Sequence, residues 1–225
     1  MGLTGQSVGT HAIDTGLEIK KRTEKDYVIA LAGNPNVGKS TLFNNLTGMN
    51  QHTGNWPGKT VGNAQGYCKS KKYSYVFVDL PGTYSLMAHS AEEEIARDFI
   101  RGEESDAVLI VCDATCLERN LNLVLQILEI SQRAIVCVNL LDEAKKKQIQ
   151  INLDRLSKEL GVPVAGIVAR KKESIEKVLD LLDQVFDAPI PEKEKLTSDL
   201  AGMTEEGEKK AARFVRRGEE IAATT

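Results

Sequence analysis

The fold is decided by the octapeptide Gly33-Asn34-Pro35-Asn36-Val37-Gly38-Lys39-Ser40, which matches the phosphate-binding loop pattern G-x-x-x-x-G-K-[ST]. Before it, residues 27–32 form an apolar, β-branched run that is typical of a buried strand. After it, residues 41–47 carry apolar side chains at helical spacing. The motif requires a strand, a glycine loop and a helix in this order, so the sequence predicts a site for a nucleoside phosphate.

The residue types of this loop suit phosphate binding. Its two glycines permit backbone angles and close contacts that a side chain would forbid. Successive backbone N–H groups can then bind an anion at a helix N-terminus, where the helix dipole adds positive potential. Lys39 is expected to reach the β- and γ-phosphates, and Ser40 to place its hydroxyl on Mg²⁺. The alternative is a glycine-rich turn that opens an ordinary helix. The expected nucleotide-binding residues here are Gly33, Asn34, Pro35, Asn36, Val37, Gly38, Lys39, Ser40 and Thr41.

Composition restricts the class of protein. The chain has 225 residues, of which 41% are hydrophobic and 27% are charged, as expected for a globular protein with one sizeable core. A formal net charge of −3 gives no general argument for binding nucleic acid or an acidic membrane surface. Four cysteines are too few for a disulfide scaffold and favour a reduced, cytosolic compartment. No apolar run approaches the ~20 residues that span a bilayer, and no signal peptide is evident.

The rest of the chain alternates between apolar runs and amphipathic segments, which predicts an α/β fold. Near-continuous apolar strands indicate a mostly parallel sheet of six strands with helices on both faces, and one hairpin adds one antiparallel strand. Residues 48–62 fit no secondary-structure period and are expected to form a functional loop. The expected strands are 27–32, 63–69, 73–79, 107–112, 134–138 and 162–168, and the expected helices are 41–47, 90–101, 117–130, 143–160 and 174–186.

Three regions are expected along the chain. Residues 1–26 are polar and form a leader that is either flexible or lies along an edge of the domain. Residues 27–187 form the nucleotide-binding domain. Residues 188–225 are charged and are expected to form a short or truncated helical segment, with a helix from about 205 to 222. The apolar positions of that helix are sparse, so we expect it to dock on another surface or to remain mobile.

A second candidate element, Asp79-Leu80-Pro81-Gly82, stands at the carboxyl end of a predicted buried strand. Open α/β sheets bind ligands at those strand ends. A carboxylate at Asp79 could hold Mg²⁺ through water, and the Gly82 N–H could contact a γ-phosphate. The alternative is a simple D-x-P-G turn.

A third element, Asn139-Leu140-Leu141-Asp142, has the N-x-x-D pattern that reads the purine in GTPases. The Asp142 carboxylate would accept hydrogen bonds from N1–H and the 2-amino group of guanine, which adenine cannot offer. The Asn139 amide would reach N7 and join neighbouring loops. Alone, an aspartate before a helix is more often an N-cap. After the last strand, Val168-Ala169-Arg170 completes the set, with the Ala169 N–H facing guanine O6.

A threonine in the long loop completes the predicted site. Thr60 could coordinate Mg²⁺ and contact the γ-phosphate, which would order the loop in the triphosphate state. Thr53 lies in the same loop, so position alone does not choose between them.

In this order, the four elements resemble those of a Ras-like P-loop GTPase of the bacterial translation-factor-related class. Three further stretches are similar to the cytosolic G domain of the ferrous iron transport protein B family: residues 54–60 (Gly-Asn-Trp-Pro-Gly-Lys-Thr), 79–86 and 113–121. The similarity runs from about residue 27 to 186. It implies a GTP-hydrolysing switch that is attached to a membrane permease for Fe²⁺.

The resemblance also implies roles for residues. In similar GTPases an asparagine at the position of Asn36 helps to bind K⁺, together with carbonyl groups that would here belong to Gly54 and Trp56. The alternative is that the Asn36 side chain only stabilises the loop. Ras-type proteins keep a water-orienting glutamine where this chain has Thr83, which cannot reach the same place. The implied activity is slow, Mg²⁺-dependent and K⁺-stimulated GTP hydrolysis. The implied catalytic residues are Asn36, Lys39, Thr60 and Gly82, and the loop residues implied to contact nucleotide are Gly54, Trp56, Pro57, Gly58, Lys59 and Thr60.

The same resemblance implies partners and a location. The partners are GTP, the transporter's own membrane domain and small accessory iron-transport proteins, and a homo-oligomer is possible. The full-length protein would lie at the cytoplasmic face of the bacterial membrane. One alternative is a soluble GTPase in ribosome or RNA maturation, but the basic runs are short and balanced by acids, so no nucleic acid is expected. Another is a binding module that does not hydrolyse GTP, which the threonine at position 83 leaves open.

Overall fold

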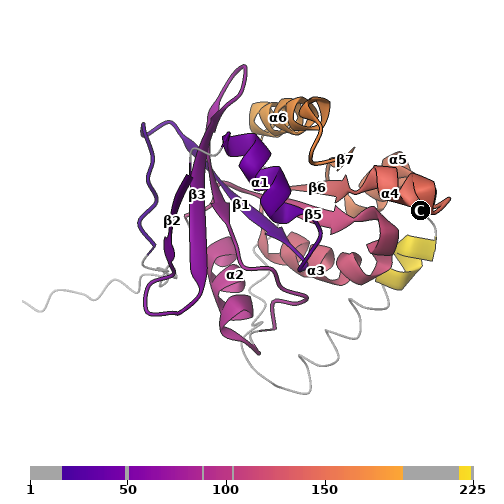
Figure 1. The fold of residues 1–225 in the computed structure, drawn as a ribbon, viewed down its shortest axis with the longest axis horizontal. Helices are drawn as coiled ribbons and strands as arrows, with labels where there is room; N and C mark the ends of the chain where they lie inside the picture. Colours follow the sequence, from indigo (N-terminus) through magenta and orange to yellow (C-terminus); the bar gives the residue numbers. More distant parts are fainter. Residues whose placement is uncertain (1–16, 49–50, 88, 103, 190–217, 224–225) are drawn as a thin grey trace, which may run out of the picture.

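The chain folds around one mixed β-sheet. The computed structural model describes residues 17–48, 51–87, 89–102, 104–189 and 218–223. Within these residues, seven strands pair in the order β2-β3-β4-β1-β5-β6-β7 (Figure 1). Only the β2–β3 and β3–β4 pairings are antiparallel, so β3 alone runs against the other strands. The strands are β1 (Tyr27–Gly33), β2 (Gln51–Asn55), β3 (Gly62–Lys69), β4 (Ser74–Asp79), β5 (Ala107–Asp113), β6 (Ala134–Asn139) and β7 (Val164–Gly166).

The prediction of a mostly parallel sheet with one reversed strand is confirmed, but the predicted number of six strands is wrong. The additional strand is β2, which lies in the region that the sequence predicts to be an irregular loop. It is an edge strand held by β3, with pairs from Gln51↔Gly66 to Asn55↔Gly62. Its side chains from His52 onward are exposed. A strand without a buried face lacks the hydrophobic period by which strands are identified.

Helices cover both faces of the sheet, as the apolar strands predict. Along β1, Ile29 and Leu31 belong to the core under α1 and α6, whereas Val28 and Ala30 belong to the opposite core under α2 and α3. A short 3₁₀ turn, η1 (Ala114–Cys116), joins β5 to α3. The helices of the first face are α1 (Lys39–Thr47) and α6 (Lys172–Asp187), and those of the second are α2 (Ala91–Arg101), α3 (Leu117–Ile130), α4 (Leu141–Lys146) and α5 (Leu153–Leu160).

The helix predicted for residues 143–160 is divided in the structure, so that prediction is wrong in detail. α4 ends at Lys146, and the chain then turns through Gln148, whose φ of 58° is left-handed. α5 begins after Asn152, whose side chain accepts a hydrogen bond from the Arg155 N–H at 2.9 Å. Asparagine is among the preferred N-caps, so the signal for a second helix was present in the sequence.

Two segments outside the sheet pack against it. Residues 17–26 run beside β3, where the Gln65 side chain accepts from the Lys20 N–H at 3.0 Å and donates to the Glu18 carbonyl at 2.9 Å. A helical stretch at 218–223 lies beside α3 and buries Ile221 in the core under α2 and α3 (Figure 1). Most of the helix predicted for 205–222 falls outside the described residues. No helix among the described residues is long and apolar enough to span a bilayer.

Candidate functional site

The phosphate loop connects β1 to α1 at the carboxyl edge of the sheet, and its glycines are required by contacts. A Cβ at Gly33 would lie 2.5 Å from the Val111 carbonyl oxygen. Gly38 has a left-handed φ of 84°, and a Cβ there would lie 2.4 Å from Nδ2 of Asn139. Asn36 is exposed with a φ of 65°, a conformation that asparagine tolerates better than most residues. The backbone of the loop is therefore held close to two neighbouring strands.

Lys39 and Asp79 meet below this loop. The Lys39 ammonium forms an ion pair with Asp79 and also donates to the Leu80 carbonyl at 2.6 Å. Burial raises the pKa of the Asp79 carboxyl above its ordinary value, and the Lys39 charge offsets part of that increase. A lysine and a carboxylate at one place give the site a cation for phosphate oxygens and an anion for a metal ion. Ser40 and Thr41 follow on the exposed start of α1.

The Asp79–Gly82 turn packs directly against the phosphate loop. A Cβ at Gly82 would lie 3.2 Å from Cα of Pro35, so these two backbones approach closely. The N–H of the next residue, Thr83, donates to the Gly33 carbonyl at 3.3 Å. Thr83 is itself buried.

The N-x-x-D element joins the two ends of the predicted site. The Asn139 side chain donates from Nδ2 to the Val37 carbonyl at 2.9 Å and accepts at Oδ1 from the Ala169 N–H at 2.9 Å. Asp142 forms an ion pair through Oδ2 with Arg170, whereas its buried Oδ1 has no hydrogen-bond partner among the described residues. A buried carboxylate oxygen without a partner is costly unless a ligand supplies a donor.

The structure changes one detail of the predicted base site. The Ala169 N–H, expected to face guanine O6, donates instead to Asn139, and the Val168 N–H donates to the Ser174 hydroxyl at 3.0 Å. The Leu140 backbone is left-handed, with a φ of 62°, and Leu141 begins α4. The two loops of the predicted base site, residues 139–142 and 168–170 (the base-reading loops), are therefore fixed by their own hydrogen bonds.

Residues 54–61 (the 54–61 loop), which include the last two residues of β2, pack on α2 and not on the phosphate loop. Trp56 is 2% exposed, and its ring packs edge-on against Phe99 with centroids 5.4 Å apart. The Lys59 ammonium pairs with Glu94 of α2 at 2.5 Å. Thr60 is exposed. Among the described residues, no hydrogen bond joins the 54–61 loop to the phosphate loop, so the predicted partners of Asn36 are not brought to it.

Some residues around the site were missed by sequence reasoning. Asn45 of α1 donates to the Ala169 carbonyl at 2.9 Å and supports the base-reading loop. Gln126 of α3 accepts a hydrogen bond from the Leu86 N–H, just after the Asp79–Gly82 turn. Gln126 could have been identified from the sequence as a polar side chain on the apolar face of a predicted amphipathic helix.

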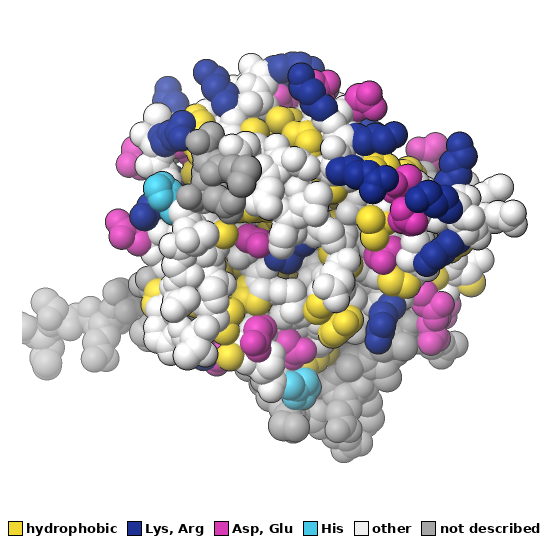
Figure 2. Space-filling view, viewed as in Figure 1, with side chains coloured by type: hydrophobic (Ala, Val, Ile, Leu, Met, Phe, Trp, Pro, Cys, Tyr) yellow, Lys and Arg dark blue, Asp and Glu magenta, His cyan; other side chains and the backbone are white. Residues whose placement is uncertain are grey.

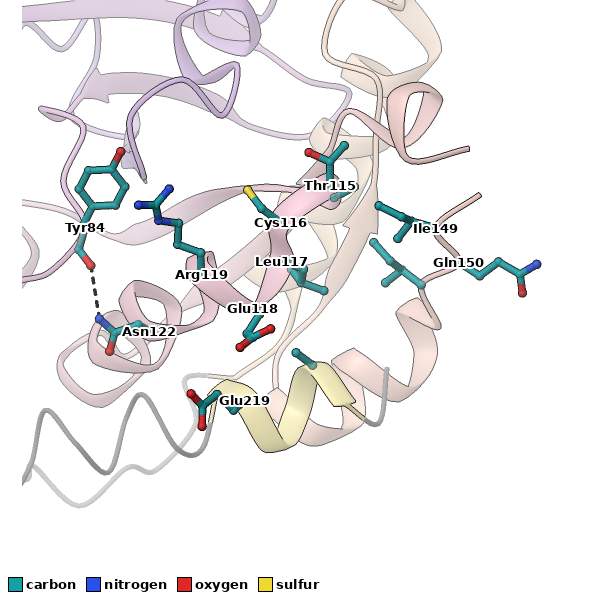
Figure 3. Close-up of a pocket in the computed structure, with 13 residues that line it drawn as sticks. Tyr84, Thr115, Cys116, Leu117, Glu118, Arg119, Asn122, Ile149, Gln150 and Glu219 are labelled. Atoms are coloured by element: carbon teal, nitrogen blue, oxygen red, sulfur yellow. Dashed lines mark hydrogen bonds between the residues drawn. The ribbon is translucent and has the colours of Figure 1, made fainter. Parts of the chain in front are cut away.

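A cavity of about 770 Å³ lies beside this region and contains none of the predicted nucleotide-binding residues (Figure 3). It opens between η1, the start of α3, the chain after α4 and the helical stretch at 218–223. Tyr84, 48% exposed, forms part of its wall, and the Arg119 guanidinium lies 5.2 Å from the centre of that ring. This cavity is therefore distinct from the candidate nucleotide site.

The charged surface shows no single dominant sign. Figure 2 shows lysine and arginine side chains interspersed with acidic ones around the margin of the face in view. Several of the basic residues form ion pairs, among them Lys71 with Asp180 at 2.7 Å and Lys146 with Glu143 at 2.8 Å. On the described part of this face, the basic side chains form no continuous patch of the kind that is typical of nucleic-acid binding.

Comparisons with known proteins agree with this geometry. The family model described as Ferrous iron transport protein B matches residues 27–182. The Fe(2+) transporter FeoB of Salmonella typhimurium (strain LT2) is 44% identical over 164 residues, and so is that of Escherichia coli (strain K12). Each match covers 71% of this chain and 21% of the relative, so the chain spans about a fifth of the length of these relatives.

Solved structures show the same relationship. The G domain of T. maritima FeoB matches with a TM-score of 0.67 at 41% identity, over 71% of this chain and 98% of that one. The G domain from Methanococcus jannaschii gives 0.64 at 43% identity, over 73% and 99%. The cytosolic domain of T. maritima FeoB gives 0.77 at 30% identity, over 88% and 98%. From its motifs, its fold and these matches, the chain belongs to the ferrous iron transport protein B family.

Proposed function

We propose that this chain binds guanine nucleotides and hydrolyses GTP, as the switch domain of a membrane transporter for Fe²⁺. The observation that carries the proposal is the Asn139 side chain, which joins the phosphate loop at Val37 to the base-reading loop at Ala169. One side chain thereby fixes the spacing between a phosphate site and a base site. The matched relatives are Fe²⁺ transporters, and the cytosolic domain of one, from T. maritima, has been solved in a GDP form.

The phosphate groups are bound by the backbone N–H groups of residues 33–40 and by Lys39. The Lys39 ammonium, now shared by Asp79 and the Leu80 carbonyl, exchanges these partners for β- and γ-phosphate oxygens. The guanine ring is read by Asp142, whose buried Oδ1 gains a donor from N1–H or the 2-amino group. Adenine would leave that oxygen without a donor.

Mg²⁺ fits the oxygen donors at the end of β4 and the start of α1. Ser40 and Asp79 would hold the ion, with Thr60 as a third ligand once the 54–61 loop approaches. Bound Mg²⁺ supplies positive charge to the phosphate oxygens. The backbone of Gly82 lies close to the phosphate loop at Pro35, and its N–H would donate to the terminal phosphate. Because Thr83 replaces a glutamine, backbone groups near Gly82 and Thr60 orient the attacking water.

The K⁺ site is the least assembled part of the proposal. Asn36 is exposed beside the phosphate loop, but the Gly54 carbonyl belongs to β2 and Trp56 is packed against Phe99. K⁺ would need the 54–61 loop to leave α2 before all three residues could serve as ligands. We further propose that K⁺ bound in this way stimulates GTP hydrolysis and that the turnover is slow.

The wider context follows from the family. The domain would work beneath the transporter's own membrane domain at the cytoplasmic face of the bacterial membrane, with residues 188–225 as a helical segment leading toward it. Small accessory iron-transport proteins and further copies of this chain are the proposed partners. The matched relatives are iron transporters, which gives no support to the alternative role in ribosome or RNA maturation.

A phosphate-release assay tests the proposed function. The purified chain is given GTP or ATP with Mg²⁺, in K⁺ or in Na⁺, and Lys39→Ala serves as the inactive control. We expect phosphate from GTP only, with faster release in K⁺, and at least about a hundredfold loss in the control. Equal release from ATP would refute the guanine site, and equal rates in the two salts would refute the role of Asn36.

A further inference from the structure

α3 carries a buried glutamine that none of the steps above uses. Gln126 is 1% exposed, and the helix positions around it that face the core, such as Val124 and Ile127, are apolar. A polar side chain in such a place is costly unless its hydrogen bonds are made. Its partners therefore identify what the side chain does.

Gln126 binds the chain that follows the Asp79–Gly82 turn. Its Oε1 accepts from the Leu86 N–H at 2.6 Å and from the Ser85 hydroxyl at 3.2 Å. Its Nε2 donates to Oδ1 of Asn122, one helical turn earlier, at 3.3 Å. Asn122 in turn donates to the Tyr84 carbonyl at 3.5 Å, as Figure 3 shows. Two amide side chains on one face of α3 thus hold residues 84–86.

Among the described residues, the one other hydrogen bond of this segment is local, from the Met87 N–H to the Ser85 hydroxyl at 3.1 Å. The segment belongs to neither β4, which ends at Asp79, nor α2, which begins at Ala91. The Tyr84 ring is half exposed and borders the 770 Å³ cavity, so packing does not enclose it. The Leu86 side chain is fully buried, which anchors one end of the segment but leaves its N–H in need of an acceptor.

The position of this segment matters because it leads directly into the reacting groups. Thr83 donates to the Gly33 carbonyl, and the backbone of Gly82 lies against Pro35. If backbone groups orient the attacking water, a shift of this segment moves them relative to the phosphate. A displacement of 1 Å in a catalytic group can cost about 10²-fold in rate.

We propose that Gln126 is a positioning residue for GTP hydrolysis, which holds residues 84–86 and through them the Gly82–Thr83 backbone at the terminal phosphate. The inference rests on the proposed GTPase function. Gln126 contacts neither the phosphate loop nor the base-reading loops in the described structure, so its effect falls on turnover and not on nucleotide affinity.

The test compares Gln126→Leu with the unaltered chain. We expect kcat for GTP to fall by about tenfold or more, while KM and the dissociation constant for GDP change by less than about twofold. In hydrogen exchange without nucleotide, the Leu86 amide should lose its protection because its acceptor is gone. The buried Leu86 side chain remains, so the variant keeps the packing needed to fold.

Two further variants separate the hydrogen bond from general stability. Gln65→Leu removes a second buried glutamine, which binds residues 18 and 20, and should leave kcat within about twofold. Gln126→Glu keeps an acceptor oxygen for the Leu86 N–H and should restore most of the lost turnover. Both variants are checked for a native circular dichroism spectrum.

The outcomes are distinct. An unaltered kcat in Gln126→Leu, or an equal fall in Gln65→Leu, overturns the positioning role and leaves the GTPase proposal standing. A loss of GDP affinity equal to the loss of kcat also overturns it, because a structural role would then account for both. A chain that hydrolyses no GTP before any substitution overturns both proposals, and that result is read from the unaltered protein alone.

Discussion

At the scale of single residues, Asp142 has the most specific expected role. Replacing it with asparagine should weaken GDP binding by about 10²-fold or more, because an amide cannot accept from both N1–H and the 2-amino group of guanine. The same change should improve binding of xanthosine diphosphate, whose carbonyl at position 2 accepts from the new amide. Calorimetric titration of the Asp142→Asn variant with both nucleotides measures this.

The neighbouring acid supplies a matched control for that prediction. Glu143 forms a surface pair with Lys146 and has no part in the proposed base site. Glu143→Gln should therefore bind GDP as the unaltered chain does. Undiminished GDP binding by the Asp142→Asn variant would show that Oδ1 of Asp142, which has no partner among the described residues, does not bind the base.

Asp26 gives a prediction about stability and pH. Burial by itself raises the pKa of this carboxyl, but hydrogen bonds from the Thr23 hydroxyl and from the Thr23 and Arg22 N–H groups outweigh it, so the pKa lies below its ordinary value. A lowered folded-state pKa stabilises the protein above the unfolded pKa, and the gain is lost as the pH falls through the folded value.

Asp26→Asn should therefore lower the free energy of unfolding by about 1–3 kcal/mol at pH 7. The difference should shrink below about pH 4, where the unfolded carboxyl also takes up a proton. Urea denaturation at several pH values measures this, with the exposed neighbour Glu24→Gln as the control. A difference that stays constant down to pH 3 would mean that ionisation of Asp26 is irrelevant.

The residues that could be predicted from the sequence are those whose roles depend on local spacing. The phosphate loop, Asp79 and the Asn139–Asp142 pair all follow strands directly, so their place at one edge of the sheet is fixed by the strand pattern. The partners chosen across the fold could not be predicted in the same way. The Ala169 N–H binds Asn139, and Trp56 enters the core, because of contacts between segments far apart in the chain.

At the scale of elements, the 54–61 loop and α2 form one unit that nucleotide binding should separate. Trp56 is the only tryptophan of the chain, so its fluorescence reports on this contact alone. With a non-hydrolysable GTP analogue and Mg²⁺, we expect the emission to shift to longer wavelength as the ring leaves Phe99 and meets water. An emission maximum that is unchanged at saturating analogue would show that the loop stays on α2.

Removing the ion pair between these elements should favour the released loop. Lys59 and Glu94 are 38% and 45% exposed, so their pair contributes at most about 1 kcal/mol, or a fivefold change in population. Glu94→Gln should therefore give a larger fraction of released Trp56 at the same analogue concentration. Asp180→Asn removes a comparable surface pair with Lys71 and serves as the control.

The elements that the sequence failed to predict share a physical cause. β2 is held by backbone pairing with β3 and buries none of the side chains from His52 to Asn55, so it carries no pattern. The division of the helix predicted over 143–160 depends on one left-handed residue, Gln148, and one cap, Asn152. In both regions the secondary structure depends on backbone pairing or backbone conformation, which the spacing of apolar side chains does not indicate.

At the scale of the whole molecule, the sheet separates two cores, and the loops of the candidate site have buried residues in both, such as Val37 in one and Leu80 in the other. α1 and the loop at Ala169 pack on one face, whereas α2, α3 and the 54–61 loop pack on the other. This arrangement follows from apolar strands buried on both sides, which is why the α/β class was predictable. A nucleotide bound at the carboxyl edge would contact loops anchored in both cores.

That arrangement predicts how the whole domain responds to ligand. A nucleotide that binds only the folded chain stabilises it by about 2.7 kcal/mol at a concentration of 100 times Kd. For a domain of this size, each kcal/mol raises Tm by about 2–4 °C, so GDP with Mg²⁺ should raise Tm by about 5–11 °C. ATP at the same concentration should leave Tm unchanged, because adenine cannot satisfy Asp142. A calorimetric scan of the Asp142→Asn variant at the same GDP concentration should show an increase of only about 1–2 °C, because its Kd is about a hundredfold higher. If that variant kept the full increase, binding of the phosphates alone would explain the stabilisation, and Asp142 would contribute nothing to nucleotide binding.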